Sequence, residues 1–332
     1  MTLTPNELIS LAEGALRFTV DAEGYVSFLR FTEKQEAFYR ATNPDFYKKT
    51  KATARVRLSF ETDADSFSVD FRATTASSRS FCYFDLFVDG VMLDHQGSEE
   101  SAPHGTLRFT LPRGTHRVTL YLPGLFAARL ANFTLPDGAR ITPTAKPHRM
   151  LLLGDSITQG YDALYPSQSY ANLISDMLSL GAVNQGIGGE LFNPDVIDGN
   201  LPFTPEIITV AYGTNDYSKS TREKMTATAN EFFRRLRVAF PHAQIFAILP
   251  IWRADTAVPR VLGSFEDARE IVRAAAMAQN GITVLDGDSF VPHLPAFFSD
   301  SYLHPNDLGF KFYADALCKA LLPHLKKEHY DI

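Results

Sequence analysis

From about residue 15 to residue 135, hydrophobic and polar positions alternate with a period of two. The segments ARVRLSF, SFSVDFRA and TLRFTL each place their apolar side chains on one side of an extended chain, as half-buried strands do. Asp89-Gly90 predicts a tight hairpin, because a primed turn needs positive φ and glycine adopts it readily. PRGT, between two alternating runs, predicts another hairpin. The segment shows almost no helical pattern, so residues 1–140 are predicted to form an antiparallel, jelly-roll-like β-sandwich.

A polar segment rich in proline, PDGARITPTAKPH at residues 136–148, interrupts this pattern and marks the predicted domain boundary. Beyond it, short aliphatic runs alternate with segments of helical period. This alternation predicts an α/β domain at residues 148–330, with a parallel sheet covered by helices on both faces. The five predicted strands are RMLLLGD, GAVNQGI, PEIITVAYG, AQIFAILP and GITVLD. Because ligands bind beyond the carboxyl ends of such strands, functional residues are expected directly after these runs.

The residues at these positions are those that an acyl-transfer site needs. Ser156 follows the first run, the glycines of NQGIGG follow the second, Asn215 follows the third, and His304 precedes the last predicted helix. A serine hydroxyl becomes a nucleophile when an imidazole takes its proton. The amides of Ser156 and Gly189 and the side-chain amide of Asn215 would stabilise the negative charge on an ester oxygen. Each motif alone is weak, and GDS alone favours a helix-capping turn; their order at successive strand ends favours a site.

In order and context, GDS, NQGIGG, GTND and HPND resemble the motifs of the SGNH (GDSL-type) hydrolase family, over roughly residues 148–325. The resemblance implies a flavodoxin-like three-layer α/β/α fold and ester hydrolysis without a metal or organic cofactor. It implies Ser156 as nucleophile, Ser156, Gly189 and Asn215 as oxyanion-hole donors, and His304 as base. The longer string GDSITQGYDA, together with NQGIGGE and an N-terminal β-domain, is similar to a two-domain branch that includes acyltransferases as well as esterases.

The acid of the expected triad departs from the family pattern. It usually lies three residues before the histidine, where this chain has Ser301, whereas Asp300 lies four before. Our hypothesis is that a bulged loop lets Asp300 orient the imidazole through its other nitrogen. Asp288 is a second candidate, and a backbone carbonyl, which would leave a Ser-His dyad, is a third. Asp155 and Asp216 are interpreted as helix caps or loop braces.

Aromatic and charged residues beside the motifs are candidates for the substrate pocket. Trp252 and Arg253 end the fourth aliphatic run, and Tyr161, Phe192 and Tyr217 directly follow motifs. An indole and a guanidinium at the rim could shape the acyl or leaving-group pocket, but a packed indole and a surface guanidinium are equally compatible with the sequence. The three other aromatic residues could likewise belong to the core.

Composition and charge restrict the partners and the compartment. The 332 residues carry 32 basic and 38 acidic side chains, a formal net charge of −6, so no basic face for nucleic acid is expected. Cys82 and Cys318 each lie in an apolar run and are expected to be reduced, and no His pairing of the HxxxH or HExxH type predicts a metal. No signal-peptide pattern or run of 18 apolar residues is found, so a soluble, cytoplasmic protein is expected.

Together these features predict a serine esterase that cleaves acyl esters, acetyl esters among them, of small or carbohydrate-like alcohols through an acyl-enzyme on Ser156. An acyltransferase would use the same site and pass the acyl group to another hydroxyl; the sequence does not separate the two. A hypothesis of another class is a carbohydrate-binding protein with a vestigial hydrolase fold, against which the intact set of nucleophile, base and oxyanion donors argues. A homo-oligomer is left open.

Overall fold

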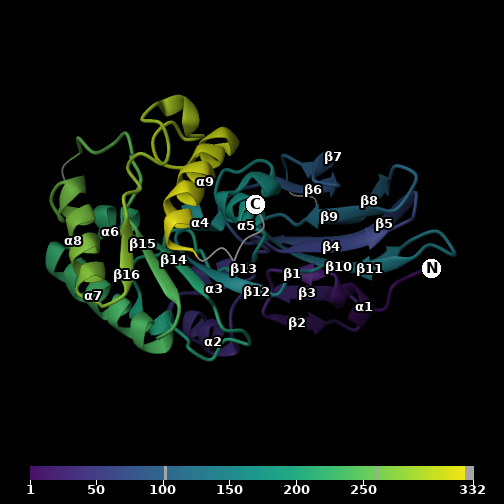
Figure 1. Ribbon diagram of the computed structural model, residues 1–332, viewed down its shortest axis with the longest axis horizontal. Helices are drawn as coiled ribbons and strands as arrows, with labels where there is room; N and C mark the ends of the chain where they lie inside the picture. The colour runs from purple at the N-terminus through teal and green to yellow at the C-terminus, as the bar shows by residue number, and fades with distance from the viewer. Residues whose placement is uncertain (101–102, 259, 326–332) are drawn as a thin grey trace.

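The computed structural model describes residues 1–100, 103–258 and 260–325, and the predicted domain end at residue 330 lies outside them. A β-rich N-terminal domain and an α/β domain lie side by side (Figure 1). β11 (Ile141–Pro143) pairs with β4 (Arg57–Thr62) of the β-rich domain, and the first strand of the parallel sheet, β12 (His148–Gly154), begins five residues later. The chain therefore passes from one domain to the other within a few residues.

Two antiparallel sheets form the first domain within the described residues. The first sheet contains, in spatial order, β1 (Ala12–Glu13), β4 (Arg57–Thr62), β9 (His116–Tyr121), β6 (Cys82–Val88) and β7 (Val91–Ser98). The second contains β2 (Arg17–Val20), β3 (Val26–Leu29), β10 (Phe126–Thr134), β5 (Ser66–Thr75) and β8 (His104–Thr110). Leu58 and Phe60 of the first sheet share one core with Phe67 and Phe109 of the second. The predicted antiparallel sandwich is confirmed.

One of the two predicted hairpins is correct. Asp89 and Gly90 adopt φ values of 49° and 81° between the paired strands β6 and β7. The prediction for PRGT, residues 112–115, is wrong: β8 before it pairs with β5 in one sheet, and β9 after it pairs with β4 and β6 in the other. Alternation identifies both strands as half-buried but does not identify their partners, so a crossing between sheets has the same pattern as a hairpin.

Helices in the first domain were not predicted from the sequence. They are α1 (Pro5–Ser10), α2 (Glu33–Thr42) and α3 (Pro44–Thr50). α2 begins with a capping box in which Thr32 and Gln35 bond reciprocally, and Asn43 caps α3. The buried residues of α2 are Gln35, Glu36 and Tyr39. Since this buried face is largely polar, α2 lacks the apolar stripe by which a helix is recognised in sequence.

The second domain is built on a five-stranded parallel sheet. Its spatial order is β13 (Gly181–Asn184), β12 (His148–Gly154), β14 (Ile207–Ala211), β15 (Gln244–Ile248) and β16 (Ile282–Leu285). This is the flavodoxin-like order 2-1-3-4-5, in which the chain direction across the sheet reverses beside the first strand. Alternate residues of β12 enter opposite cores: Met150 and Leu152 enter one, and Leu151 and Leu153 enter the other. Burial on both faces explains the unbroken aliphatic runs.

Helices cover both faces of this sheet, which confirms the predicted three-layer architecture (Figure 1). α5 (Tyr170–Met177) and α9 (Asp307–Leu321) pack on one face, and α7 (Arg222–Ala239) and α8 (Phe265–Met277) pack on the other. Two short helices, α4 (Ser156–Gln159) and α6 (Thr214–Lys219), follow β12 and β14 directly. None of the helices formed by the described residues has the length and apolar character needed to cross a membrane.

Two buried arginines join the domains. Arg30 of the first domain donates to the backbone carbonyls of Asn184 and Gly186, in the loop that leaves the edge strand β13. Arg55 donates to the carbonyl of Ala182 in β13 at 2.8 Å. Burial lowers the pKa of Arg30 to about 9 and that of Arg55 to about 10. The first domain thus supplies hydrogen-bond donors to the edge of the parallel sheet, where an unpaired strand would otherwise need water.

Candidate active site

The turn after β12 places Ser156 at the carboxyl edge of the parallel sheet. β12 ends at Gly154, and a Cβ atom there would overlap the Thr158 side chain and the Ala211 carbonyl, so the turn requires glycine. Asp155 caps α4: its Oδ1 accepts the Ile157 amide at 3.0 Å, and burial raises its pKa to about 6. Ser156 then begins the helix, in line with the cap interpretation of Asp155.

Three side chains predicted to act together form one hydrogen-bonded chain. Ser156 Oγ lies 2.9 Å from His304 Nε2, and His304 Nδ1 lies 2.6 Å from Asp300 Oδ2. The serine comes from the turn after β12, whereas the other two residues come from the loop before α9. The structure therefore brings a hydroxyl, an imidazole and a carboxylate from distant segments into the order that nucleophilic catalysis requires.

The loop before α9 explains how Asp300 reaches the imidazole from four residues away. Ser301 adopts a positive φ of 67°, which inserts the extra residue as a bulge. Asp300 Oδ1 accepts the backbone amides of Tyr302, Leu303 and His304 at 3.1, 2.8 and 3.0 Å. Although burial alone would raise it, these amides and the imidazole hold the pKa of Asp300 well below its usual range. The side chain is therefore fixed as a carboxylate.

Asp288, the second candidate for the acid, lies elsewhere. Its carboxylate is 3.3 Å from His293 Nε2 and 3.9 Å from the guanidinium of Arg269. The carbonyl of Asp288 also contacts His293 Nε2 at 2.8 Å. Asp288 is thus part of an exposed cluster beyond β16, while Asp300 occupies the position beside His304.

Potential oxyanion donors lie at the neighbouring strand ends. Gly189 has φ +88°, and its carbonyl accepts from Lys219 Nζ at 3.3 Å. Gly188 donates its amide to Gln159 Oε1 at 2.8 Å, which ties the glycine loop to α4. Asn215, near the start of α6, has a buried Nδ2 that makes no hydrogen bond to any described residue. A buried amide without a partner is available to a substrate oxygen.

A comparison with known protein families finds a match in the second domain. The model of the GDSL-like lipase/acylhydrolase family matches residues 152–312, which include the segments after β12, β13 and β14 and the loop before α9. Residues 152–312 are therefore similar to a GDSL-like lipase/acylhydrolase domain. Among curated proteins, no sequence matches the chain.

Solved structures share both domains. A salicylyl-acyltransferase from a tetracycline biosynthetic pathway is 21% identical, with a TM-score of 0.84 over 98% of each chain. A protein from Bacteroides ovatus assigned as a GDSL-like lipase is 17% identical, with a TM-score of 0.77 over 97% of each chain. A family two carbohydrate esterase from Cellvibrio japonicus is 17% identical, with a TM-score of 0.64 over 97% of each chain. At these identities the likeness shows the two-domain fold.

Two of the predicted pocket residues lie close to histidines. Tyr161 stacks on His304, with ring centroids 5.7 Å apart and an interplanar angle of 29°. Trp252 stacks instead on His293 at 5.2 Å and leans against Phe298. The Tyr161 ring thus covers one face of the imidazole, whereas Trp252 packs beside the cluster beyond β16.

The other three predicted pocket residues are buried in the α/β domain. Phe192 and Tyr217 are 3% and 1% exposed and belong to the core under α7 and α8. Arg253, 3% exposed, donates Nη1 to the Thr214 carbonyl at 3.0 Å and Nη2 to Asp255 at 2.8 Å. Arg253 is therefore a brace for Thr214, the residue before Asn215.

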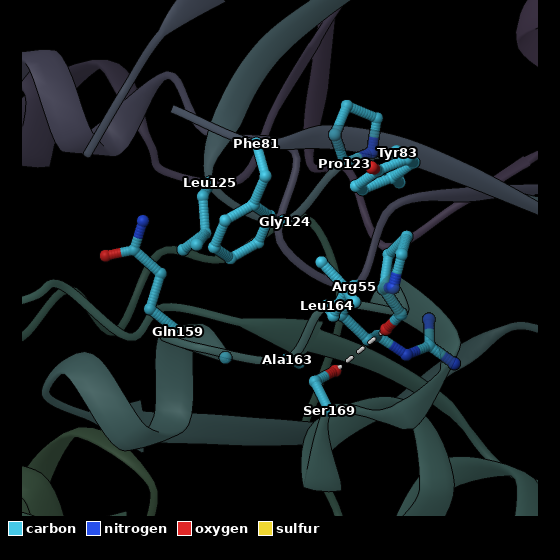
Figure 2. Close-up of a pocket in the computed structure, with 12 residues that line it drawn as sticks. Arg55, Phe81, Tyr83, Pro123, Gly124, Leu125, Gln159, Ala163, Leu164 and Ser169 are labelled. Carbon is cyan, nitrogen blue, oxygen red and sulfur yellow. Dashed lines mark hydrogen bonds between the residues drawn. The ribbon is translucent and has the colours of Figure 1, made fainter. Parts of the chain in front are cut away.

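A pocket at the domain junction lies next to the end of α4 (Figure 2). It encloses about 340 Å³, including space open to solvent. Its walls come from both domains, with Phe81 and Leu125 from the first and Gln159, Ala163 and Ser169 from the second. Because its lining residues do not include the serine, histidine and aspartate described above, we assign this junction pocket no substrate.

Asp162 and Arg79 were not identified from the sequence. Asp162 Oδ2 lies 3.9 Å from His304 Nδ1, and Arg79 of the first domain is paired with Asp162. Within the described residues, Asp162, Asp300 and His304 have donor atoms close enough together to hold a metal ion. Those carboxylates already bond Arg79 and the imidazole, and the expectation of a site without a metal stays a prediction. No local sequence pattern marks Arg79.

Glu190, the residue after Gly189, is buried in the loop that follows β13. It is 1% exposed, and the hydroxyl of Tyr39 in α2 donates to its Oε1 at 2.5 Å. Burial raises the pKa of Glu190 to about 8. The first domain and the α/β domain thus share a buried carboxyl group that releases its proton less readily than an exposed one.

We expect Glu190 to make the free energy of unfolding fall as pH rises from about 4.5 to about 8. Over this interval the folded protein keeps the Glu190 proton, which the unfolded chain releases. The stabilising contribution of Glu190 is therefore fully present below pH 4.5 and is lost by pH 8. The free energy of unfolding falls by about 1.4 kcal/mol per pH unit at most. Glu190→Gln removes this contribution. Urea unfolding between pH 5 and 9 measures it, with Glu231→Gln on the exposed side of α7 as control. Parallel curves for wild type and Glu190→Gln would contradict the assignment.

Proposed function

We propose that this protein is a serine esterase that cleaves acyl esters, acetyl esters among them, of small or carbohydrate-like alcohols. The observation that carries this proposal is the hydrogen-bonded chain of Ser156, His304 and Asp300 at the carboxyl edge of the parallel sheet. The match of residues 152–312 to an acylhydrolase family supports the reaction class. The proposed substrate is a small-molecule or carbohydrate ester, and neither nucleic acid nor a membrane is a proposed partner.

The proposed reaction begins when Ser156 Oγ attacks the ester carbonyl and His304 Nε2 accepts its proton. Asp300 holds Nδ1–H and stabilises the imidazolium that forms. The imidazolium then protonates the alkoxide as the ester C–O bond breaks, which releases the alcohol and leaves the acyl group on Ser156. Water repeats the sequence: His304 takes its proton, the acyl–oxygen bond breaks, and the free acid and the serine hydroxyl are regenerated.

The tetrahedral intermediates carry a negative oxygen that needs fixed donors. We assign these to the amides of Ser156 and Gly189 and to Asn215 Nδ2. The support is the positive φ of Gly189 and the buried Nδ2 of Asn215, which has no hydrogen-bond partner among the residues that the structure describes. Loss of one oxyanion donor typically lowers kcat by about 10²–10³-fold.

An acyltransferase is the second candidate function. A structural neighbour with both domains is a salicylyl-acyltransferase, and another is a carbohydrate esterase. The two reactions share the acyl-enzyme and differ only in whether water or another hydroxyl reaches it. The carbohydrate-binding hypothesis remains a prediction that a glycan panel would test on the full chain.

The test is hydrolysis of 4-nitrophenyl esters from acetate to octanoate, in the presence and absence of a competing alcohol. We expect free acid as the main product and the highest kcat/KM for the short chains. A transfer product that dominates over free acid would replace the esterase by the acyltransferase. Failure to release nitrophenol from every ester, with no transfer product, would contradict acyl-ester chemistry at this site.

A further inference from the structure

A second carboxylate faces the proposed base. Asp162 follows α4 and has a positive φ of 70°, a conformation that Asp and Asn tolerate better than most residues. Its side chain is 8% exposed, and its Oδ2 lies 3.9 Å from His304 Nδ1. Since Asp300 lies 2.6 Å from the same nitrogen, two acidic groups approach one N–H. In such an arrangement, another interaction must favour one of the two carboxylates as the acceptor of the hydrogen bond.

Arg79 of the first domain holds Asp162. Arg79 lies in the loop between β5 and β6, and its Nε donates to Asp162 Oδ1 while its Nη2 donates to Oδ2 at 3.0 Å. This forked pairing uses both carboxylate oxygens and raises the pKa of Arg79. The guanidinium also lies 5.2 Å from the ring centroid of Tyr161, which stacks on the imidazole. One side chain of the β-sandwich therefore contacts both residues that flank His304.

The charges around His304 come from four segments. Asp300 comes from its own loop, Asp162 from the segment after α4, Arg79 from the first domain, and the buried Asp155 from the turn before Ser156. Arg79 is the cation of this group that is paired directly with a carboxylate beside the imidazole. Its removal would leave Asp162 charged and unpaired next to the base.

We propose that Arg79 is a positioning residue of the esterase site: it neutralises and fixes Asp162, so that Asp300 alone accepts the Nδ1–H hydrogen bond of His304. This inference rests on the proposed function and extends it to the first domain. With Asp162 held, the imidazole keeps the orientation that presents Nε2 to Ser156. With Asp162 free, a second negative charge at about 4 Å favours the imidazolium, which cannot accept the serine proton.

Two single substitutions that remove charges of opposite sign test this role. We call the acidic side of the pH profile of kcat/KM, where the rate rises with pH, the acid limb. In Arg79→Met, the acid limb moves to higher pH by about one unit. This shift lowers kcat/KM at pH 6 roughly tenfold and leaves it nearly unchanged above pH 8. In Asp162→Asn, which suits the positive φ, the limb moves to lower pH because Arg79 is left unbalanced. Arg79→Lys keeps the charge and retains most of the wild-type profile. The double variant Arg79→Met/Asp162→Asn returns the limb toward wild type.

The result that contradicts the role of Arg79 differs from the result that contradicts the proposed esterase. If wild type is active but both single variants keep the wild-type acid limb, or move it in the same direction, the electrostatic role of Arg79 is wrong while the esterase stands. If wild type hydrolyses no ester, the proposed function and this inference fall together. Titration of the His304 ring followed by NMR in the unliganded protein, assigned with His304→Gln, gives the same comparison for a variant that folds but turns over slowly. Circular dichroism establishes that each variant is folded.

Discussion

Ser156→Ala is expected to lower kcat/KM on 4-nitrophenyl acetate by about 10⁵-fold or more, the largest effect of any single substitution in this chain. Without Oγ no acyl-enzyme forms, and the residual rate comes from the oxyanion donors and from substrate binding alone. The fold should survive, because the Ser156 side chain contacts His304 and is not needed to cap α4, which Asp155 caps. Equal unfolding curves for variant and wild type would establish this.

The measurement combines steady-state rates with a pre-steady-state burst. Wild type is expected to release one nitrophenolate per active site before the steady state, with an acyl adduct on the peptide that contains Ser156. Ser156→Ala should show neither. Ser301→Asn is the matched control, since Asn tolerates the φ of 67° at that position and the change should alter the rate by less than about threefold. A burst that persists in Ser156→Ala would assign the nucleophile to another residue.

The parallel sheet could be predicted because both of its faces are buried. Every strand then reads as an aliphatic run, and the helices between strands carry apolar stripes for one face or the other. The same logic failed for α2, whose buried residues Gln35 and Tyr39 meet polar groups of the second domain. Its third buried residue, Glu36, pairs with Arg17 and Lys51. The pattern of hydrophobic positions in a sequence indicates burial in apolar surroundings. It does not detect a helix or strand that is buried against a polar surface.

The candidate site divides in a similar way. The meeting of Ser156 and His304 could be predicted because the carboxyl ends of parallel strands lie at one edge, so residues after successive strands converge. The oxyanion roles of Gly189 and Asn215 stay predictions. Arg79 could not be predicted, because it reaches that edge from another domain across a sequence separation of 83 residues.

Nearness to a motif in sequence also proved insufficient. Phe192 and Tyr217 follow motifs directly, yet their side chains enter the core below the loops. A strand end fixes the edge at which a residue lies. The direction of its side chain depends on the backbone conformation of the turn, and the turns here include glycines with positive φ, Gly189 and Gly213.

Asp300→Asn is expected to lower kcat/KM by about 10³–10⁴-fold near neutral pH. The two oxygens of Asp300 have different tasks, and asparagine separates them. Oδ1 accepts three backbone amides of the loop, and an amide oxygen can keep that role. Oδ2 accepts from His304 Nδ1, where an NH₂ group can only donate and therefore favours the wrong tautomer of the imidazole. The loop should remain folded, while the imidazole of His304 no longer acts as an effective base.

Asp288→Asn is the control for this substitution, because its carboxylate contacts His293 and Arg269. We expect a change in kcat/KM of less than about threefold. The pH profile adds an independent check: the loop amides and the imidazole keep the pKa of Asp300 below its usual range, so its carboxylate stays charged across the working range and contributes no acid limb of its own. If Asp300→Asn keeps the rate within threefold while Asp288→Asn reduces it, the acid of the triad is misassigned. A rate near wild type in both variants would instead leave Ser156 and His304 as a dyad, with the loop carboxylate acting only on the backbone.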